Sequence, residues 1–353
     1  MNATDNYNEV KRRIQEALEQ NADRLYLDSL GLADLPPELG ELTSVTHLNL
    51  EFNEFETLPD ILWQLPQLEI LFMEGNLLRV VSERINEFQR LETLHLHGCK
   101  LKELPASIGE LKNLEILAVD ENCLERLPQS IGNLPNLEQL GLSVNFLETL
   151  PQSFGRLTSL SSISLGDNQL RMLPDSFVEL KSLDWLELPY NQLITLPSDF
   201  GKLSALNVMS LARNPITALP ENLPPMEFLD LSNCDNITRL PETLKVTGTL
   251  RLGGQKLSFL PSGCKDAKIQ WYWSEFGERF IFHRETINTR DVLLAQDHFA
   301  REHLLNLMEY DQLLREVEMT TLDEIEREGD TLRLVKIDIP NSEPETYLLT
   351  INR

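Results

Sequence analysis

The chain has 353 residues, with 31 Lys and Arg against 56 Asp and Glu, which gives a net charge of −25. This excess of negative charge disfavours nucleic acid and anionic membrane surfaces as partners and favours basic proteins. No stretch has the roughly 20 apolar residues of a membrane span, and residues 1–20 lack the apolar core of a signal peptide. The cysteines, Cys99, Cys123, Cys234 and Cys264, do not form the terminal clusters of a disulfide-bonded cap. We therefore expect a cytoplasmic protein.

Residues 1–21 carry an amphipathic pattern that predicts a helix over 5–20. Asp5 stands where an N-cap is expected, and apolar side chains recur at helical spacing at Tyr7, Val10, Ile14, Ala17 and Leu18. We expect this helix to cap the region that follows. The triplet Lys11-Arg12-Arg13 could instead be a localisation or nucleic-acid patch, but it lies among acidic residues, as in an ordinary solvated face.

Between Ala22 and Pro261 one pattern, L-x-L-x-x-N-x-L-x-x-L-P, recurs about eleven times. A repeat of this length predicts a solenoid, in which each unit buries its leucines only against its neighbours. We assign it to residues 22–277. Its asparagines fall on one 23-residue grid, with Leu30 and Cys99 at two further grid positions, and they are Asn53, Asn76, Asn122, Asn145, Asn168, Asn191 and Asn214.

Within each unit the alternating leucines predict a short strand whose apolar side faces inward, as for Leu140 and Leu142. The strands should form a parallel sheet on the concave side. Because an asparagine amide both donates and accepts, we expect the stacked asparagines to pair with buried loop backbone. Segments such as 105–114, behind a proline, predict an irregular or short helical convex side and a curved stack.

The residues that alternate with the leucines should point onto the concave surface. In the first units they are acidic, aromatic and histidine side chains, and a second aromatic group follows several repeats later. Aromatic anchors and carboxylates suit a basic protein partner. The predicted partner-binding residues are Tyr26, Asp28, Asn49, Glu51, Phe52, Phe72, Glu74, His95, His97 and Asp120, and in the second group Trp185, Glu187 and Tyr190, with Phe228 and Asp230 nearby.

One row of this surface has an alternative interpretation. Glu74, His97 and Asp120 on neighbouring strands, with His95 beside them, could hold a divalent metal. Such a row is more often an acidic stripe in which histidines shield like charges, so we predict no metal. For the concave surface as a whole, the alternative to partner binding is that its exposed residues are unselected.

The repeats change towards the C-terminus. From Pro220 the units shorten, with steps of 20 and 21 residues, and Trp271 and Trp273 predict a closing strand. Residues 278–353 indicate a small α+β domain. We expect in it a strand at 279–283, a helical region from 289 to about 318, and strands at 319–325, 331–339 and 346–351, separated by Gly- and Pro-containing turns.

The motif L-P-x-x-I-G-x-L-x-x-L at Leu104–Leu114 and Leu127–Leu137 resembles the leucine-rich repeats of Ras-binding scaffold proteins and of bacterial proteins with this consensus. The shorter units at 240–261 and the tail sequences at 282–293, 308–316 and 341–351 are similar to bacterial proteins that end in a domain of unassigned function. The resemblance implies an α/β solenoid, a curved horseshoe with a parallel concave sheet, an N-terminal helical cap and a small C-terminal α+β domain. It also implies the bacterial cytoplasm, and it implies no activity.

Motifs for catalysis are sparse. The sequence has no G-x-x-x-x-G-K-[ST] loop, so no GTPase domain is expected. Cys264-Lys265-Asp266 resembles the C-x-D of bacterial effector ubiquitin ligases, in which a nucleophilic cysteine stands beside its activating acid, but Cys264 falls in an expected convex loop. We predict a monomeric, non-catalytic scaffold for a protein partner, without a cofactor. An effector-type ligase acting through Cys264 and a regulator of a small GTPase are the alternatives.

Overall fold

The computed structural model describes residues 3–255, 257, 259–271, 274–275, 319–327, 330–337 and 345–351. The chain forms two units, Met1–Lys268 and Ile269–Arg353. The strand expected at 279–283, the helical region expected at 289–318 and Trp273 lie outside the described residues.

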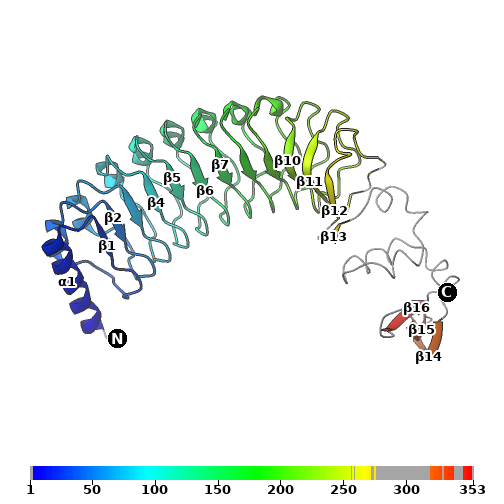
Figure 1. Ribbon diagram of the computed structural model, residues 1–353, viewed down its shortest axis with the longest axis horizontal. Helices are drawn as coiled ribbons and strands as arrows, with labels where there is room; N and C mark the ends of the chain where they lie inside the picture. Colours follow the sequence, from blue (N-terminus) through cyan, green and yellow to red (C-terminus); the bar gives the residue numbers. More distant parts are fainter. Residues whose placement is uncertain are drawn as a thin grey trace. The chain divides into compact units, whose positions relative to one another are not determined.

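The first unit contains a parallel sheet whose strands follow one another in chain order from β1 to β11. Core leucines of adjacent strands are in register, as Leu25 with Leu48 and Leu48 with Leu71 show. The strands line the inner side of an arc (Figure 1), which confirms the predicted curved solenoid. The strands are β1 Arg24–Tyr26, β2 His47–Asn49, β3 Ile70–Phe72, β4 Thr93–His95, β5 Ile116–Ala118, β6 Gln139–Gly141, β7 Ser162–Ser164, β8 Trp185–Glu187, β9 Val208–Ser210, β10 Met226–Asp230 and β11 Val246–Leu252.

Short 3₁₀ helices form the outer side of this arc (Figure 1). Many begin directly after the proline of the L-P pair, as η4 does after Pro105, because the ring fixes φ near the value that the turn needs. A wider outer side against a narrow strand makes the stack curve. The outer helices are η1 Pro37–Glu41, η2 Asp60–Gln64, η3 Glu83–Glu87, η4 Ala106–Glu110, η5 Gln129–Asn133, η6 Gln152–Arg156, η7 Asp175–Glu179 and η8 Phe200–Lys202.

Glycine and phenylalanine determine how closely these outer helices pack. A Cβ on Gly109 would lie 2.2 Å from the carbonyl oxygen of Ser130, so only glycine permits this approach of adjacent turns. Farther along, the rings of Phe154, Phe177 and Phe200 are fully buried and stack in series, with centroids 6.0 and 6.3 Å apart. The stack joins the outer ends of three successive repeats into one core.

The asparagine positions form a buried ladder between sheet and outer loops. The Asn122 amide donates to the carbonyl oxygens of Leu96 (2.8 Å) and Val119 (3.1 Å), and its oxygen accepts from the backbone N–H of Leu101 (3.0 Å). Each amide thus links its own repeat to the preceding one. Equivalent bonds are made by Asn53, Asn76, Asn145, Asn168, Asn191 and Asn214.

Other residues complete this ladder. The Cys99 thiol lies 3.6 Å from the Met73 carbonyl oxygen, and the Cys234 thiol lies 3.1 Å from the Leu211 carbonyl oxygen, so both act as donors to the previous repeat. Gln255, which the sequence analysis did not assign, is buried and bonds to the Leu231 carbonyl in the same way. Its spacing after Leu250 and Leu252, L-x-L-x-x-Q, was the signal for this role.

The residue before the ladder position has a left-handed backbone in many repeats. The φ angles are positive at Phe52 (51°), Gly75 (66°), Gly98 (65°), Glu121 (51°), Val144 (56°), Asp167 (52°), Tyr190 (55°) and Arg213 (57°). This backbone conformation is unfavourable for residues other than glycine. We call these positions the left-handed column.

The N-terminal helix α1 spans Ala3–Gln20, so it begins earlier than expected and Asp5 lies within its first turn rather than at its N-cap. Val10, Ile14 and Ala17 are buried as predicted. Tyr7 is not: its ring is exposed and lies 5.3 Å below the ammonium of Lys11.

The basic triplet of α1 is engaged in ion pairs with acidic neighbours. The Lys11 ammonium lies 2.8 Å from the Glu38 carboxylate, and the Arg12 and Arg13 guanidinium groups lie 2.7 and 2.8 Å from Glu9. Arg13 also donates to the Tyr26 carbonyl oxygen at 2.9 Å, which ties α1 to the first strand. These pairs agree with a solvated face rather than a nucleic-acid patch.

The second unit contains two antiparallel arrangements among its described residues. Strand β12 (Lys268–Trp271), which starts at the unit boundary, pairs with β13 (Ser274–Glu275). Strands β14 (Met319–Arg327), β15 (Asp330–Ile337) and β16 (Glu345–Ile351) form a separate sheet in that order. The strands expected at 319–325, 331–339 and 346–351 are present as β14, β15 and β16, each within a few residues of its predicted bounds.

Candidate functional site

The register of the sheet aligns the predicted partner-binding residues of the first repeats in one row. Tyr26, Asn49, Phe72 and His95 pair directly as neighbours on β1 to β4. Beyond each strand end follow Asp28, Glu51, Glu74 and His97, which are all partly exposed. Together with Phe52 these residues form what we call the N-terminal concave cluster. Adjacent strands are about 4.8 Å apart, so the cluster is continuous across four repeats.

Two aromatic side chains of the cluster are exposed to solvent rather than buried in the core. Tyr26 is 52% exposed and Phe52 is 58% exposed. The Phe52 ring lies over Gly75, where a Cβ would come within 2.5 Å of the ring. The rings of Phe72 and His95 meet edge to face with centroids 4.8 Å apart. The Tyr26 and Phe52 rings are therefore both presented to solvent, and Phe52 rests on the backbone of the next repeat.

The polar members of the cluster form short-range pairs. The Asn49 amide donates to the Glu51 carboxylate at 3.0 Å. The His95 Nδ1 lies 3.9 Å from the Glu74 carboxylate, and the His97 Nε2 lies 3.7 Å from Glu121. Burial lowers the pKa of His95, while the carboxylates of Glu74, Glu51 and Asp120 oppose that shift. The histidine is therefore mainly neutral at pH 7.

Asp120 does not extend this row. Its carboxylate accepts hydrogen bonds from the Ser143 backbone N–H (2.8 Å) and the Ser164 hydroxyl (3.1 Å), and it lies over Gly141, where a Cβ would be 1.9 Å from Oδ2. The carboxylate thus turns toward the following repeats, because the small residues there leave room and donors. In the described part of the chain, no group of three His, Cys, Asp or Glu is arranged to hold a metal ion.

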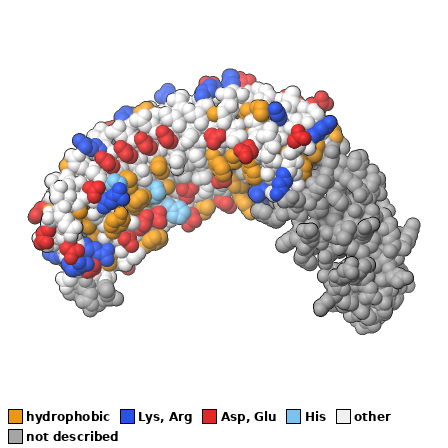
Figure 2. Space-filling model, viewed as in Figure 1, with side chains coloured by type: hydrophobic (Ala, Val, Ile, Leu, Met, Phe, Trp, Pro, Cys, Tyr) orange, Lys and Arg blue, Asp and Glu red, His pale blue; other side chains and the backbone are white. Residues whose placement is uncertain are grey.

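A column of glutamates, which the sequence analysis did not assign, borders the same half of the sheet. Glu69, Glu92, Glu115 and Glu138 each stand immediately before a strand, β3 to β6, and backbone hydrogen bonds of 2.8 Å link each to the next. Within residues 3–255 no Lys or Arg forms an ion pair with these carboxylates. Their recurrence every 23 residues was the available signal. Figure 2 shows acidic, hydrophobic and histidine side chains gathered on this half of the visible face.

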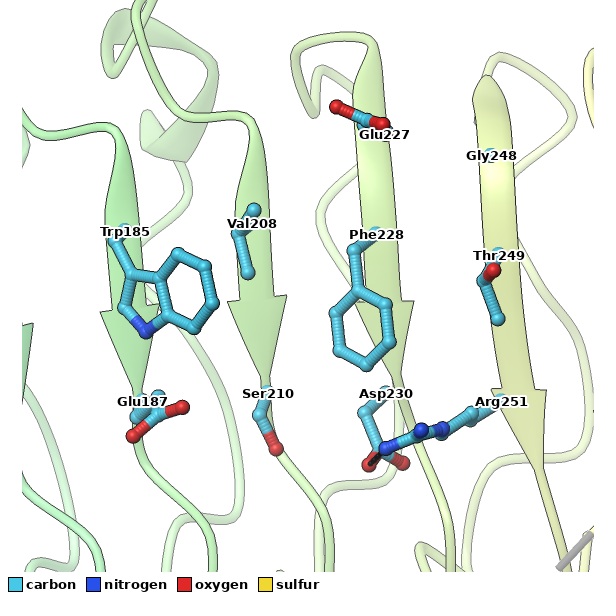
Figure 3. Close-up of a pocket in the computed structure, with 10 residues that line it drawn as sticks. All are labelled: Trp185, Glu187, Val208, Ser210, Glu227, Phe228, Asp230, Gly248, Thr249 and Arg251. Atoms are coloured by element: carbon cyan, nitrogen blue, oxygen red, sulfur yellow. Dashed lines mark ion pairs between the residues drawn. The ribbon is translucent and has the colours of Figure 1, made fainter. Parts of the chain in front are cut away.

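A second feature lies farther along the sheet, where Trp185 and Glu187 were predicted to bind a partner. Side chains of strands β8 to β11 line an open hollow of about 500 Å³ on the sheet (Figure 3). We call it the β8–β11 hollow; it is lined by Trp185, Glu187, Val208, Ser210, Glu227, Phe228, Asp230, Gly248, Thr249 and Arg251. Tyr190 is half-exposed in the loop after β8, outside this lining, and the Arg213 guanidinium lies 4.8 Å above its ring.

Family models match the first unit over most of its repeats. A leucine-rich repeat region model matches residues 75–145, and a leucine-rich repeat model matches residues 20–78 and 142–193. The chain is a leucine-rich repeat protein. No curated protein matches it.

Solved structures of other leucine-rich repeat proteins share this fold. A leucine-rich repeat protein of Leptospira interrogans is 27% identical with a TM-score of 0.61, and the match covers 74% of this chain and 68% of that one. YopM of Yersinia enterocolitica is 28% identical with a TM-score of 0.55, covering 74% and 58%. YopM of Yersinia pestis, described as a leucine-rich effector protein, is 24% identical with a TM-score of 0.53, covering 76% and 82%.

No helix among the described residues is long and apolar enough to cross a membrane.

Cys264 is buried in the last of the short repeats, its thiol lies 3.7 Å from the Leu244 carbonyl oxygen, and burial raises its pKa. A nucleophilic cysteine needs an exposed, electropositive setting that lowers its pKa, so these findings argue against the ligase alternative.

Proposed function

We propose that this protein is a non-catalytic scaffold that binds a protein partner with a basic surface on its concave face, chiefly through the N-terminal concave cluster. The observation that carries the proposal is the registered row Tyr26, Asn49, Phe72 and His95, flanked by carboxylates. Leucine-rich repeat solenoids serve widely as protein-interaction modules, and their extended concave sheet is the usual surface.

The exposed rings support this proposal on energetic grounds. When a partner covers a half-exposed ring, the free energy of binding becomes more favourable by roughly 25 cal/mol for each Å² of apolar surface removed from water. Phe52 also holds a left-handed backbone, with φ of 51°, although glycine occupies the equivalent position in the next repeat. Because the left-handed turn recurs in many repeats, the feature that favours binding at this turn is the exposed ring and not the backbone conformation.

The charge distribution favours a basic partner. The four-glutamate column and the carboxylates of the cluster lie on one half of the sheet, within a chain of net charge −25. Such a field accelerates association with a cationic surface and disfavours anionic competitors, and the effect weakens as salt rises.

Charge reversal in the cluster tests the proposal. The double variant Glu51→Lys with Glu74→Lys should abolish capture of the partner by the full chain and leave the melting temperature nearly unchanged, because both carboxylates are partly exposed. The matched control is Glu125→Lys with Glu148→Lys, which makes the same change of charge in exposed loops off the sheet. If the control loses the partner equally, net charge rather than the cluster governs binding and the proposal fails.

The proposed organisation is a cap helix over 1–21, the solenoid over 22–277 and a separate α+β domain over 278–353, in a monomer of the bacterial cytoplasm. The unit division after Lys268 and the antiparallel sheet β14–β15–β16 support a separate C-terminal domain. To test whether this domain binds independently, the partners captured by the full chain and by the double variant are compared. A partner that is still captured after charge reversal would support independent binding.

A further inference from the structure

The β8–β11 hollow is built from two registered rows of side chains. Trp185, Val208, Phe228 and Thr249 pair across the four strands, and Glu187, Ser210, Asp230 and Arg251 pair across them in the next outward-facing row. Figure 3 shows the Trp185 and Phe228 rings on either side of the small Val208, with the charged row beside them. An apolar slot thus adjoins a line of ionic groups.

The chain's own arginines already pack on two aromatic rings of this region. The Arg251 guanidinium lies 5.0 Å from the Phe228 ring centroid, and the Arg213 guanidinium lies 4.8 Å from that of Tyr190. A guanidinium over an aromatic face is attracted by the ring quadrupole and stacks well on it. Trp185, which has the largest ring of the three and is 43% exposed, has no such cation among residues 3–255.

Two of the three carboxylates that line the hollow, Glu187 and Glu227, form no ion pair with a described residue. Asp230 is nearly buried, lies 3.7 Å from Arg251 and accepts from the Ser232 backbone N–H at 2.9 Å. Glu227 accepts only a long hydrogen bond, 3.5 Å, from the neutral Asn207 amide. Glu187, two residues from Trp185 on the same side of β8, forms no ion pair with a described residue. The lining therefore carries an excess of negative charge, and Glu187 is the carboxylate on the same strand as Trp185.

From this arrangement we propose that Trp185 and Glu187 bind an arginine side chain of the partner polypeptide. The guanidinium lies on the indole face, as the chain's own arginines lie on Phe228 and Tyr190, and donates to the Glu187 carboxylate. Arginine fits better than lysine because its planar group can stack and form a two-point bond together. This inference rests on the proposed function, since it names the residue type that the concave face selects.

The test uses the full chain labelled with 5-fluorotryptophan and followed by ¹⁹F NMR. The chain has four tryptophans, and the Trp185→Phe variant assigns the resonance of interest. The probe is N-acetyl-arginine methylamide, with the citrulline compound as its neutral isostere. The arginine probe should shift the Trp185 resonance saturably, and the citrulline compound should not. The resonance of Trp63, which already carries Arg84 over its ring at 5.1 Å, serves as internal control and should stay in place.

Glu187→Gln should weaken binding of the arginine probe by at least about fivefold, because it removes the charge from one hydrogen-bond acceptor. Glu148→Gln, an equal change in an exposed loop, should leave binding unchanged. The inference is overturned if the Trp185 resonance does not respond to arginine, if citrulline gives an equal shift, or if Glu187→Gln has no effect.

The two proposals fail separately. If Glu51→Lys with Glu74→Lys abolishes partner capture but the Trp185 resonance ignores arginine, the concave face binds a partner without an arginine site. If arginine binds at Trp185 but charge reversal in the N-terminal concave cluster leaves capture intact, the site assignment in the proposed function is wrong.

Discussion

Replacing Asn145 with alanine should lower the stability of the solenoid by roughly 3–5 kcal/mol. The Asn145 oxygen accepts from the Leu124 backbone N–H at 2.9 Å, and its amide donates to the carbonyl oxygens of Val119 and Leu142 at 3.0 Å and of Ser143 at 3.3 Å. Alanine leaves the buried N–H without an acceptor and deprives the carbonyls of a donor. Each buried group left unsatisfied costs about 1–3 kcal/mol, and the longest of these bonds contributes least.

Cysteine at the same position provides the sharper comparison. Cys99 occupies a ladder position naturally, with its thiol 3.6 Å from the Met73 carbonyl oxygen. Asn145→Cys should therefore cost clearly less than Asn145→Ala, about half as much, because a weak donor and acceptor remains. The converse change, Cys99→Asn, should be neutral or stabilising.

Urea unfolding of the full chain, followed by circular dichroism, measures these differences. The m-value should stay unchanged, since the folded surface is the same. If Asn145→Ala costs less than about 1 kcal/mol, water must satisfy the loop backbone and the ladder is not the reason for the repeated asparagine. If cysteine is as costly as alanine, bonding by the side chain is not what the position requires.

Further predictions concern the core, the thiols, the histidines and the acidic column. Phe177→Ala should cost roughly 3–5 kcal/mol in urea unfolding, because the ring is fully buried between two others. Burial raises the pKa of Cys234 to about 11, so at pH 8 a thiol reagent should modify the partly exposed Cys123 first and Cys234 only on unfolding; equal rates in the folded protein would contradict its burial. Burial lowers the pKa of His95 below its ordinary 6.5, so the unfolded chain takes up more protons and stability should fall as the pH drops from about 7 through the lowered pKa. His95→Gln should remove that part of the pH dependence, and an unchanged slope of the urea midpoint between pH 7 and 5 would refute the assignment. Glu115→Lys should raise stability by about 0.5–1 kcal/mol at low salt, because it replaces repulsion from two neighbouring carboxylates with attraction, and the gain should shrink at high salt.

The architecture was predictable because the repeat leaves few alternatives. Alternating leucines such as Leu140 and Leu142 fix which side of each strand is buried, and the period fixes the parallel stacking of one strand on the next. The same logic placed Tyr26, Asn49 and Phe72 side by side, since residues at equal positions in successive units must be neighbours.

What the period cannot give is the direction of a side chain on the surface. Asp120 was expected beside His97, but Gly141 next to it leaves space and the Ser143 N–H offers a bond, so the carboxylate turns the other way. Tyr7 fits the apolar pattern of α1 but lies beyond the residues that the sheet end covers. Gln255 was not predicted because the shortened repeats after Pro220 leave the 23-residue grid, although a buried glutamine amide also reaches the carbonyl of the preceding repeat.

The left-handed column has a consequence for how such a protein can change. The Cα of Phe52 or Tyr190 belongs to a turn outside the leucine core, and glycine fills the same turn at Gly75 and Gly98 without altering the stack. A substitution there changes the side chain that the concave surface presents to a partner. Its cost to folding stability is confined to the backbone torsional preference of one residue. New recognition can therefore arise at these turns one repeat at a time while the architecture beneath is inherited intact.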